Sequence, residues 1–222
     1  MLKALGQEQL KSVYAGVAGR YDVQHGLLTL GSDQRGRKLL VKLTLAEGAT
    51  VLDAGAGTGS TAMLAARRVG INGHIDLFDM SADMLAVAKS RATRAGLVER
   101  MSFHTGDLLR LPFEDGTFDV ALSTFSLCPV VNPAAGALEL YRVVKPGGKL
   151  GIAHSAEPRR PWLKWLAGKV EQAVWRFPAL SLGCRAIEVQ STLADTGAVP
   201  LFRKWVGVPL WPFEIIVFSR PA

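Results

Sequence analysis

From residue 50 onwards, short apolar runs alternate with longer stretches in which apolar residues recur every three or four positions. The short runs favour buried strands, and the longer stretches favour amphipathic helices. The predicted strands are 50–54, 74–78, 101–105, 118–123 and 149–154, and the helices between them are 61–68, 82–95 and 134–143. This alternation predicts a doubly wound α/β fold, a mostly parallel sheet with helices on both faces.

The C-terminal part of the chain changes to an antiparallel pattern. Residues 188–196 predict a helix, and two strands follow at 202–208 and 213–219. The short connection 209–212 between them suits an antiparallel hairpin at the edge of a sheet. With the five earlier strands, this predicts a seven-stranded sheet, and we expect 1–222 to form a single domain.

The N-terminal part of the chain predicts helices rather than strands. Within residues 1–46, Leu10, Val13 and Val17 are spaced as on one face of a helix, and Leu40 and its apolar neighbours follow the same period later. We expect this part to form a helical lid.

Residues 156–186 interrupt the alternation, and we expect them to form an insertion over the substrate cleft. Basic and aromatic residues interleave here: Arg159, Arg160, Trp162, Lys164, Trp165, Lys169, Trp175, Arg176, Phe177 and Arg185. Tryptophans among basic residues suit the interface of an anionic membrane. A packed cap over the cleft explains the same pattern, and stacking on nucleobases is a third interpretation.

The composition is that of a globular protein, with 49% apolar and 20% charged residues among 222. The net charge of +7 suits an anionic partner, or only keeps the protein soluble. No stretch reaches the roughly 18 apolar residues of a membrane-spanning helix. Polar residues also interrupt the N-terminus where a secretory signal would be apolar. We therefore expect a cytoplasmic protein, with the inner membrane face as the site of any peripheral contact.

The two cysteines, Cys128 and Cys184, lie far apart in the sequence and fit no metal-binding spacing. We therefore expect reduced thiols and no metal site.

The strongest motif lies where the strand 50–54 ends. Asp53 is followed by glycines at alternate positions, Gly55, Gly57 and Gly59. Such glycines permit positive φ angles and let a ligand approach the backbone closely. A phosphate-binding loop would carry a lysine after its last glycine, and here serine follows. Asp53 would repel phosphates but can anchor an ammonium group, so the motif predicts a site for a cofactor without phosphates.

Further polar residues follow the next predicted strands. Asp79 can accept two hydrogen bonds from a ribose diol, and Met80 offers an apolar face to a purine. Asp107, followed by Leu108, can accept a hydrogen bond from an adenine amine, and Ser123 marks the crevice after the fourth strand. Taken singly, Asp79 could cap a helix and Asp107 could belong to a turn. Their common place at strand ends favours one ligand site.

Several of these motifs resemble those of class I S-adenosylmethionine-dependent methyltransferases. Residues 51–59 are similar to the first motif of that superfamily, and Asp79 and Asp107 match its ribose-binding and adenine-contacting acids. Residues 111–119 and 141–150 are similar to the segments before its fourth and fifth strands. The resemblance implies a Rossmann-like fold and S-adenosyl-L-methionine as the cofactor.

Residues 17–22 and 31–33 resemble the ubiquinone/menaquinone biosynthesis methyltransferase family, whose broader relatives include phospholipid N-methyltransferases. The segment 125–133 differs from the Gly-Leu-Arg-Asn type stretch of the quinone enzymes. The resemblance implies that the N-terminal helices cover the cofactor and that Tyr21 lies near the reacting centre. It also implies methyl transfer to a lipid-like or small hydrophobic acceptor, such as a quinone precursor or a phospholipid amine.

Proton removal is needed only for a hydroxyl or carbon acceptor. His154, at the end of the strand 149–154, is the first candidate base because we expect it to face the substrate mouth, and His25 is the second. The alternative functions are a soluble small-molecule methyltransferase acting on a thiol, amine or phenol, and a non-catalytic cofactor-binding protein. A nucleic-acid substrate is disfavoured because no Asn/Asp-Pro-Pro-Tyr/Phe motif follows the fourth strand. The oligomeric state is left open.

Overall fold

A computed structural model describes residues 6–17, 21–176 and 184–222. Within these residues a seven-stranded sheet has the order β3-β2-β1-β4-β5-β7-β6. Its strands are β1 (Thr50–Ala54), β2 (His74–Asp79), β3 (Met101–Thr105), β4 (Phe118–Thr124), β5 (Val144–Ser155), β6 (Val199–Val208) and β7 (Trp211–Ser219). Strands β1 to β5 pair in parallel, whereas β7 pairs antiparallel with both β5 and β6. The predicted sheet and its antiparallel hairpin are confirmed.

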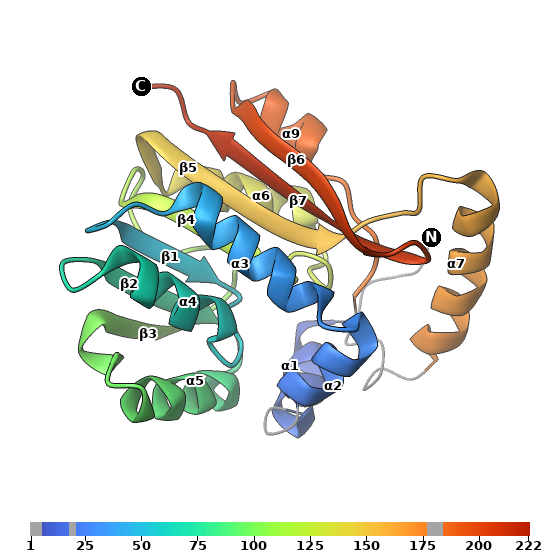
Figure 1. Cartoon of the computed structure of the whole chain (residues 1–222), viewed down its shortest axis with the longest axis horizontal. Coiled ribbons are helices and arrows are strands. Elements are labelled where there is room, and N and C mark those ends of the chain that lie inside the picture. The colour runs from blue at the N-terminus through green and yellow to red at the C-terminus, as the bar shows by residue number, and fades with distance from the viewer. Residues whose placement is uncertain (1–5, 18–20, 177–183) are drawn as a thin grey trace.

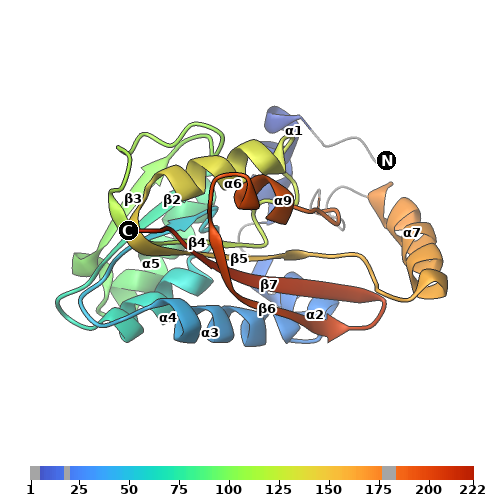
Figure 2. The same cartoon turned by 90° about the horizontal axis from the view of Figure 1, so that it is seen from above.

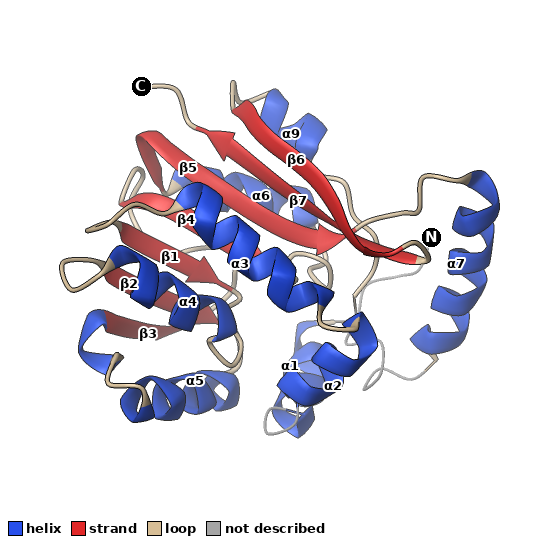
Figure 3. Ribbon diagram, viewed as in Figure 1, coloured by secondary structure: helices blue, strands red, loops and turns tan. Residues whose placement is uncertain are grey.

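Helices cover both faces of this sheet (Figures 1 and 3). One face carries α3 (Ser32–Thr44), α4 (Ser60–Val69) and α5 (Ala82–Arg94), and the other carries α6 (Pro133–Arg142) and α9 (Gln190–Ala194). Figure 2 shows the two layers on either side of the sheet. A short 3₁₀ helix, η1 (Val98–Arg100), leads into β3. The doubly wound arrangement predicted from the alternation is therefore confirmed.

Each face of the sheet has its own apolar core. Val51, Val120 and Ile215 belong to the core under α3, α4 and α5. Leu52 and Ile216 belong to the core under α6 and α9. Successive side chains of a strand point to opposite faces, so strands buried on both sides read as continuous apolar runs. This is why the strands were visible in the sequence.

Three helices lie beyond the carboxyl ends of the parallel strands: α1 (Gln7–Val17), α2 (Tyr21–Thr29) and α7 (Pro161–Trp175) (Figures 1 and 2). Helix α1 is attached to α5 by an apolar contact between buried Val17 and Met84. Helices α1, α2 and α3 agree with the helical pattern predicted in residues 1–46.

Two predicted boundaries were wrong. Strand β5 begins at Val144 rather than at 149, because Pro146 and the two glycines after it have the sequence of a turn while the ladder with β4 resumes beyond them. The predicted helix 188–196 is shorter, because the Glu188 carboxylate accepts hydrogen bonds from the N–H groups of Gln190 and Ser191 and so caps α9.

Candidate active site

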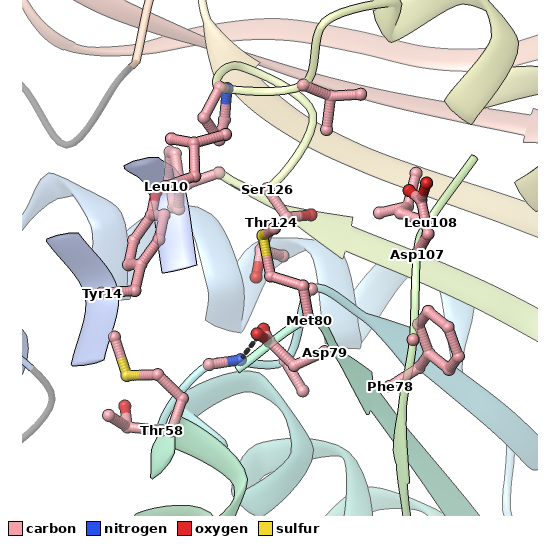
Figure 4. Close-up of a pocket in the computed structure, with 18 of the residues that line it drawn as sticks. Leu10, Tyr14, Thr58, Phe78, Asp79, Met80, Asp107, Leu108, Thr124 and Ser126 are labelled. Atoms are coloured by element: carbon pink, nitrogen blue, oxygen red, sulfur yellow. Dashed lines mark hydrogen bonds between the residues drawn. The ribbon is translucent and has the colours of Figure 1, made fainter. Parts of the chain in front are cut away.

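A pocket opens at the carboxyl ends of β1, β2 and β4, where the strand order reverses. Open α/β sheets bind ligands at this crevice. The pocket holds about 920 Å³ of space between atoms, including its open mouth. Asp107 and Leu108 lie on one side of it, and Leu10 and Tyr14 of α1 lie on the other (Figure 4). It therefore has a wall made by the sheet and a wall made by the N-terminal helices.

The glycine turn after β1 forms the floor of the pocket. Gly55 and Gly57 line it, with φ angles of 71° and 54°. A Cβ atom on Gly55 would lie 2.1 Å from the Cβ atom of Ser126, so only glycine fits there. Gly59 is not among the lining residues. It precedes α4, where a Cβ atom would lie 3.0 Å from that of Ala88, so Gly59 serves helix packing rather than ligand contact.

The carboxylate of Asp79 is held by backbone N–H groups at the end of β2. Its Oδ2 accepts from the Gly57 N–H at 2.8 Å (Figure 4), and its Oδ1 accepts from the Ser81 N–H at 2.9 Å. A carboxylate has about four lone-pair sites, so these two bonds leave room for a ligand. Burial raises the pKa of Asp79, although the backbone N–H groups of Ser81, Gly57 and Met80 act in the opposite direction. Met80 lines the pocket beside it, as the sequence predicted.

Asp107 and Leu108 line the pocket after β3, where the sequence placed them. The Leu109 N–H donates to Asp107 Oδ1 at 2.9 Å and orients the carboxylate. A Cβ atom on Gly106 would lie 2.6 Å from the ring of Phe78, so only glycine fits at this position. Asp107 is thus both a turn residue and a pocket residue, and the two interpretations of the sequence are compatible.

Asp53 does not line the pocket, contrary to the sequence-based expectation. Strand alternation points it towards α3 and α4, on the same face as Val51, and it is fully buried there. Within the described residues, no hydrogen bond of good geometry reaches either of its carboxylate oxygens, although the Ala62 N–H lies near enough to lower its pKa. Burial raises the pKa of Asp53 to about 7, although the Arg37 guanidinium acts in the opposite direction.

Ser123 was also misplaced. It is fully buried, and its hydroxyl lies 2.6 Å from that of Ser126. The Ser126 hydroxyl in turn donates to the Ala54 carbonyl at 2.8 Å. Strand β4 runs one residue beyond the predicted end, so Thr124 and Ser126 line the pocket and Ser123 supports them from behind.

The sequence analysis missed Arg37, which lies on the buried face of α3 and lines the pocket. Its Nη1 donates to the hydroxyls of Thr61 at 2.7 Å and Thr124 at 2.6 Å, and its guanidinium lies 5.1 Å from the centre of the Phe125 ring. Among the described residues, its Nε has no hydrogen-bond partner. The signal in the sequence was an arginine three residues before Leu40, at a position where the helical period requires a buried side chain.

Aromatic and apolar residues form the rest of the wall. Tyr14, Tyr21 and Phe125 line the pocket, together with Pro129 and the two valines after it. Phe125 has a positive φ of 62°, a conformation that is costly for an aromatic residue and that the sequence did not reveal. Burial raises the pKa of Tyr21, so its hydroxyl stays protonated at neutral pH.

A buried histidine–aspartate pair lies behind this wall. The His25 ring stacks on Tyr21 at 5.4 Å between centroids and lies 5.3 Å from the Phe125 ring. His25 Nδ1 lies 3.2 Å from Asp33 Oδ2, and Thr29 donates to the other oxygen of Asp33. Burial alone would raise the pKa of Asp33, but these hydrogen bonds and the nearby Arg37 hold it below its usual value.

The placement of His154 at the substrate mouth was wrong. His154 is fully buried and is not among the lining residues. It pairs with Glu214 of β7 on the face covered by α9, where Gln190 donates to Glu214 at 2.9 Å. Burial lowers the pKa of His154, so the ring is neutral. Alternation along β5 placed its side chain under α9, and the sequence could not show which face that would be.

Two properties concern the described residues as a whole. No three side chains among them gather as ligands for a metal ion. None of the helices in the described part of the chain combines the length and the apolar character needed to cross a bilayer.

Comparisons with known proteins find quinone-biosynthesis methyltransferases among the proteins of similar sequence. The chain is 34% identical over 159 residues to the ubiquinone/menaquinone biosynthesis C-methyltransferase UbiE of Stenotrophomonas maltophilia, covering 71% of this chain and 63% of that protein. It is 31% identical over 156 residues to a demethylmenaquinone methyltransferase of Lactiplantibacillus plantarum, covering 70% and 66%. The chain thus spans less than two thirds of the length of these relatives.

Solved structures share the fold at low sequence identity. The [4+2]-cyclase SpnF superposes with a TM-score of 0.77 at 20% identity, covering 100% of this chain and 99% of that one. A SAM-dependent methyltransferase from Aquifex aeolicus superposes with a TM-score of 0.62 at 24% identity, covering 82% and 88%. Residues 2–168 match the ubiE/COQ5 methyltransferase family, and the chain belongs to that family.

Proposed function

We propose that the chain binds S-adenosylmethionine in this pocket and transfers its methyl group to a carbon of a quinone precursor. The observation that carries the proposal is the Asp79 carboxylate, which the Gly57 N–H fixes at the end of β2 and which lines the pocket, where it can accept from the ribose. Asp79 would hold the ribose, Met80 and Leu108 would contact the adenine, and Asp107 would accept from its amine. When bound, the cofactor supplies an electrophilic methyl group.

The amino-acid end of the cofactor carries an ammonium and a carboxylate, and the site has a group of opposite charge for each. The Arg37 guanidinium lines the pocket; its Nε makes no hydrogen bond among the described residues and lies 3.9 Å from Asp33 Oδ2, so the guanidinium can bind a ligand carboxylate as well. The buried carboxylate of Asp53, near the end of β1, lies close enough to Arg37 for that charge to act on its pKa. We assign Asp53 to the ammonium.

The acceptor fits the wall opposite the sheet. Tyr14, Tyr21 and Phe125 offer flat apolar surfaces to a quinone ring, and they exclude water from the methyl group during transfer. Helices α1 and α2 supply the two tyrosines, so we propose that they act as the lid of the site. Tyr21 keeps its proton and can donate a hydrogen bond to an acceptor oxygen.

Methylation of a ring carbon requires the loss of a proton from the acceptor. We assign its removal to His25 rather than to His154. His25 does not line the pocket itself, but its ring lies against the rings of Tyr21 and Phe125, which do, and its Nδ1 lies 3.2 Å from Asp33 Oδ2, which can orient the ring. His154 lies on the face of the sheet covered by α9 and pairs with Glu214 there.

The exposed face of α7 supports contact with an anionic membrane, where quinone precursors reside. Trp162 and Trp165 are 60% and 68% exposed, and the neighbouring Lys164 is exposed beside them. Two exposed tryptophans on one helical face, with basic residues nearby in the sequence, suit the headgroup region of a bilayer. The side chain of Trp175 and the residues Phe177 and Pro178, which the sequence analysis included in this segment, lie outside the described residues.

Calorimetry with S-adenosylmethionine and its demethylated product tests the cofactor site. We expect Asp79→Ala to weaken binding at least 100-fold, because the ribose loses its acceptor. Asp83→Ala is the matched control, since Asp83 is an exposed carboxylate in the first turn of α5, and its affinity should stay within twofold. Equal affinities for the wild type and Asp79→Ala would refute the site.

Transfer of a labelled methyl group into a lipid and metabolite extract, followed by mass spectrometry, tests the acceptor. A labelled ring carbon of a quinone precursor supports the proposal. Label on a phospholipid amine, or on a thiol, amine or phenol of a water-soluble compound, would replace the acceptor while keeping the cofactor site. Cofactor binding without transfer to any acceptor would indicate a non-catalytic binding protein.

A further inference from the structure

The fold brings together the two cysteines of the chain, which are far apart in the sequence. The two thiols lie close enough to interact, and this contact lowers the pKa of Cys128 and raises the pKa of Cys184. Cys128 is fully buried in the segment after β4, and its sulfur also accepts from the Ser155 N–H at 3.2 Å. Ile187, three residues after Cys184, donates its N–H to the Ser155 carbonyl at 3.2 Å. Both cysteines are thus tied to the end of β5.

A second set of hydrogen bonds fixes Cys184 against the segment that carries Cys128. Arg185 donates from its Nη2 to the carbonyl oxygens of Val130 at 3.0 Å and Val131 at 3.2 Å. These backbone contacts do not involve either sulfur. The approach of the two thiols is therefore supported by backbone contacts of the residues that follow each cysteine.

The pair lies directly behind the wall of the pocket. Pro129, the residue after Cys128, lines the pocket. Cys184 is partly buried and packs in the small apolar cluster that includes Tyr14, another lining residue. A bond between the two sulfurs would join the segment after β4 to the segment before α9 across this wall.

We propose that Cys128 and Cys184 form a modification site, a dithiol that a peroxide oxidises reversibly to a disulfide. One sulfur attacks a peroxide oxygen and becomes a sulfenic acid, with release of water. The other sulfur then attacks the sulfenic sulfur, and a second water leaves. Two thiols and one hydrogen peroxide thus give one disulfide and two waters. The contact with Cys184 lowers the pKa of Cys128, which favours Cys128 as the sulfur that attacks the peroxide first.

The test uses the folded full-length protein and hydrogen peroxide as the oxidant. After brief exposure, free thiols are blocked with iodoacetamide, and the protein is digested with trypsin without reduction. We expect the intact protein to lose the mass of two hydrogen atoms and the peptides 111–142 and 177–185 to be joined. Dithiothreitol should reverse the link, and its rate of formation should not depend on protein concentration.

Cys184→Ser is the control variant, because Cys184 is only partly buried and serine changes the packing least. It should give no internal link, and Cys128 should instead be alkylated or over-oxidised. Complete alkylation of both cysteines in the treated wild type, or links only between different molecules, would overturn the proposal. The experiment measures the masses of the protein and its peptides. Its outcome therefore does not depend on whether the protein transfers methyl groups.

Discussion

The buried carboxylate of Asp53, which we assign to the ammonium group of the cofactor, should lower the stability of the ligand-free protein when it is ionised. Among the described residues no hydrogen bond of good geometry reaches its carboxylate. Burial raises its pKa to about 7, so it is largely ionised in mildly alkaline solution. An unpaired buried charge destabilises the folded state. A bound ammonium would reduce that cost. In the ligand-free protein the free energy of unfolding should therefore depend on pH through Asp53.

The free energy of unfolding should fall as pH rises from about 4 to about 7 because of Asp53. The folded state holds this proton up to about pH 7, whereas the unfolded chain releases it near 3.8, so the folded state binds more protons in that window. The slope is about 1.4 kcal/mol per pH unit, and the total is about 3–4 kcal/mol. Urea unfolding of the ligand-free protein at several pH values measures it.

Asp53→Asn should abolish this slope, because the amide does not titrate. Asp83→Asn, at an exposed position, should leave the pH dependence unchanged. Parallel curves for the wild type and Asp53→Asn between pH 5 and pH 8 would contradict the assignment.

Gly55 gives a second prediction at this scale. Gly55→Ala should destabilise the protein by about 3–5 kcal/mol, since the new methyl group meets Ser126 and the φ angle is positive. Gly96→Ala is the matched control. Its φ of 67° is similar, but no atom lies within 4 Å of the added Cβ, so only about 1–2 kcal/mol should be lost. Equal losses in urea unfolding would mean that the close approach to Ser126 does not matter.

Among the elements, α2 is fastened to the glycine turn by one side chain. Asp22 Oδ1 accepts from the hydroxyls of Thr58 at 2.9 Å and Ser60 at 3.0 Å, and its other oxygen accepts from Arg91 of α5. The same Arg91 donates to the Thr58 carbonyl at 3.0 Å. The position of α2 and the shape of the turn are therefore linked.

Asp22→Asn should loosen α2 and weaken cofactor binding about tenfold, because charged hydrogen bonds of about 1.5–3 kcal/mol are lost in part. Faster cofactor dissociation in stopped-flow measurements should account for most of the change. Glu8→Gln on α1 is the control, since Glu8 is exposed and pairs only with Lys11 among the described residues. An unchanged dissociation rate in Asp22→Asn would show that α2 does not hold the turn.

The sequence predicts best those strands that are buried on both faces of the sheet. The strands buried on both faces were found as apolar runs, and the acids at their ends, Asp79 and Asp107, were found with them. The faces of the last strands were not predictable, because β5 and β7 pair far apart in sequence and only that pairing puts His154 against Glu214. Arg37 was missed because its role depends on Thr61 in α4 and Thr124 at the end of β4, which are far apart in the sequence.

For the molecule as a whole, α7 offers a test of membrane contact. Vesicles rich in phosphatidylglycerol should bind the protein and shift its tryptophan fluorescence, whereas pure phosphatidylcholine vesicles should bind it at least tenfold more weakly. The double variant Trp162→Ala, Trp165→Ala should lose at least tenfold in affinity for the anionic vesicles. Ile71→Ala is the control, because Ile71 is 82% exposed in the loop before β2, away from α7. Full binding by the double variant would exclude α7 as the contact.

The pocket described above draws its two walls from different parts of the chain. The turns after β1, β2 and β3 present Asp79 and Asp107, whereas α1, α2 and the segment after β4 present Tyr14, Tyr21 and Pro129. Exchanging side chains on the second wall therefore leaves the first untouched. Substitutions at a few aromatic positions of the second wall should therefore change which acceptor is methylated, while the residues that hold the methyl donor stay the same.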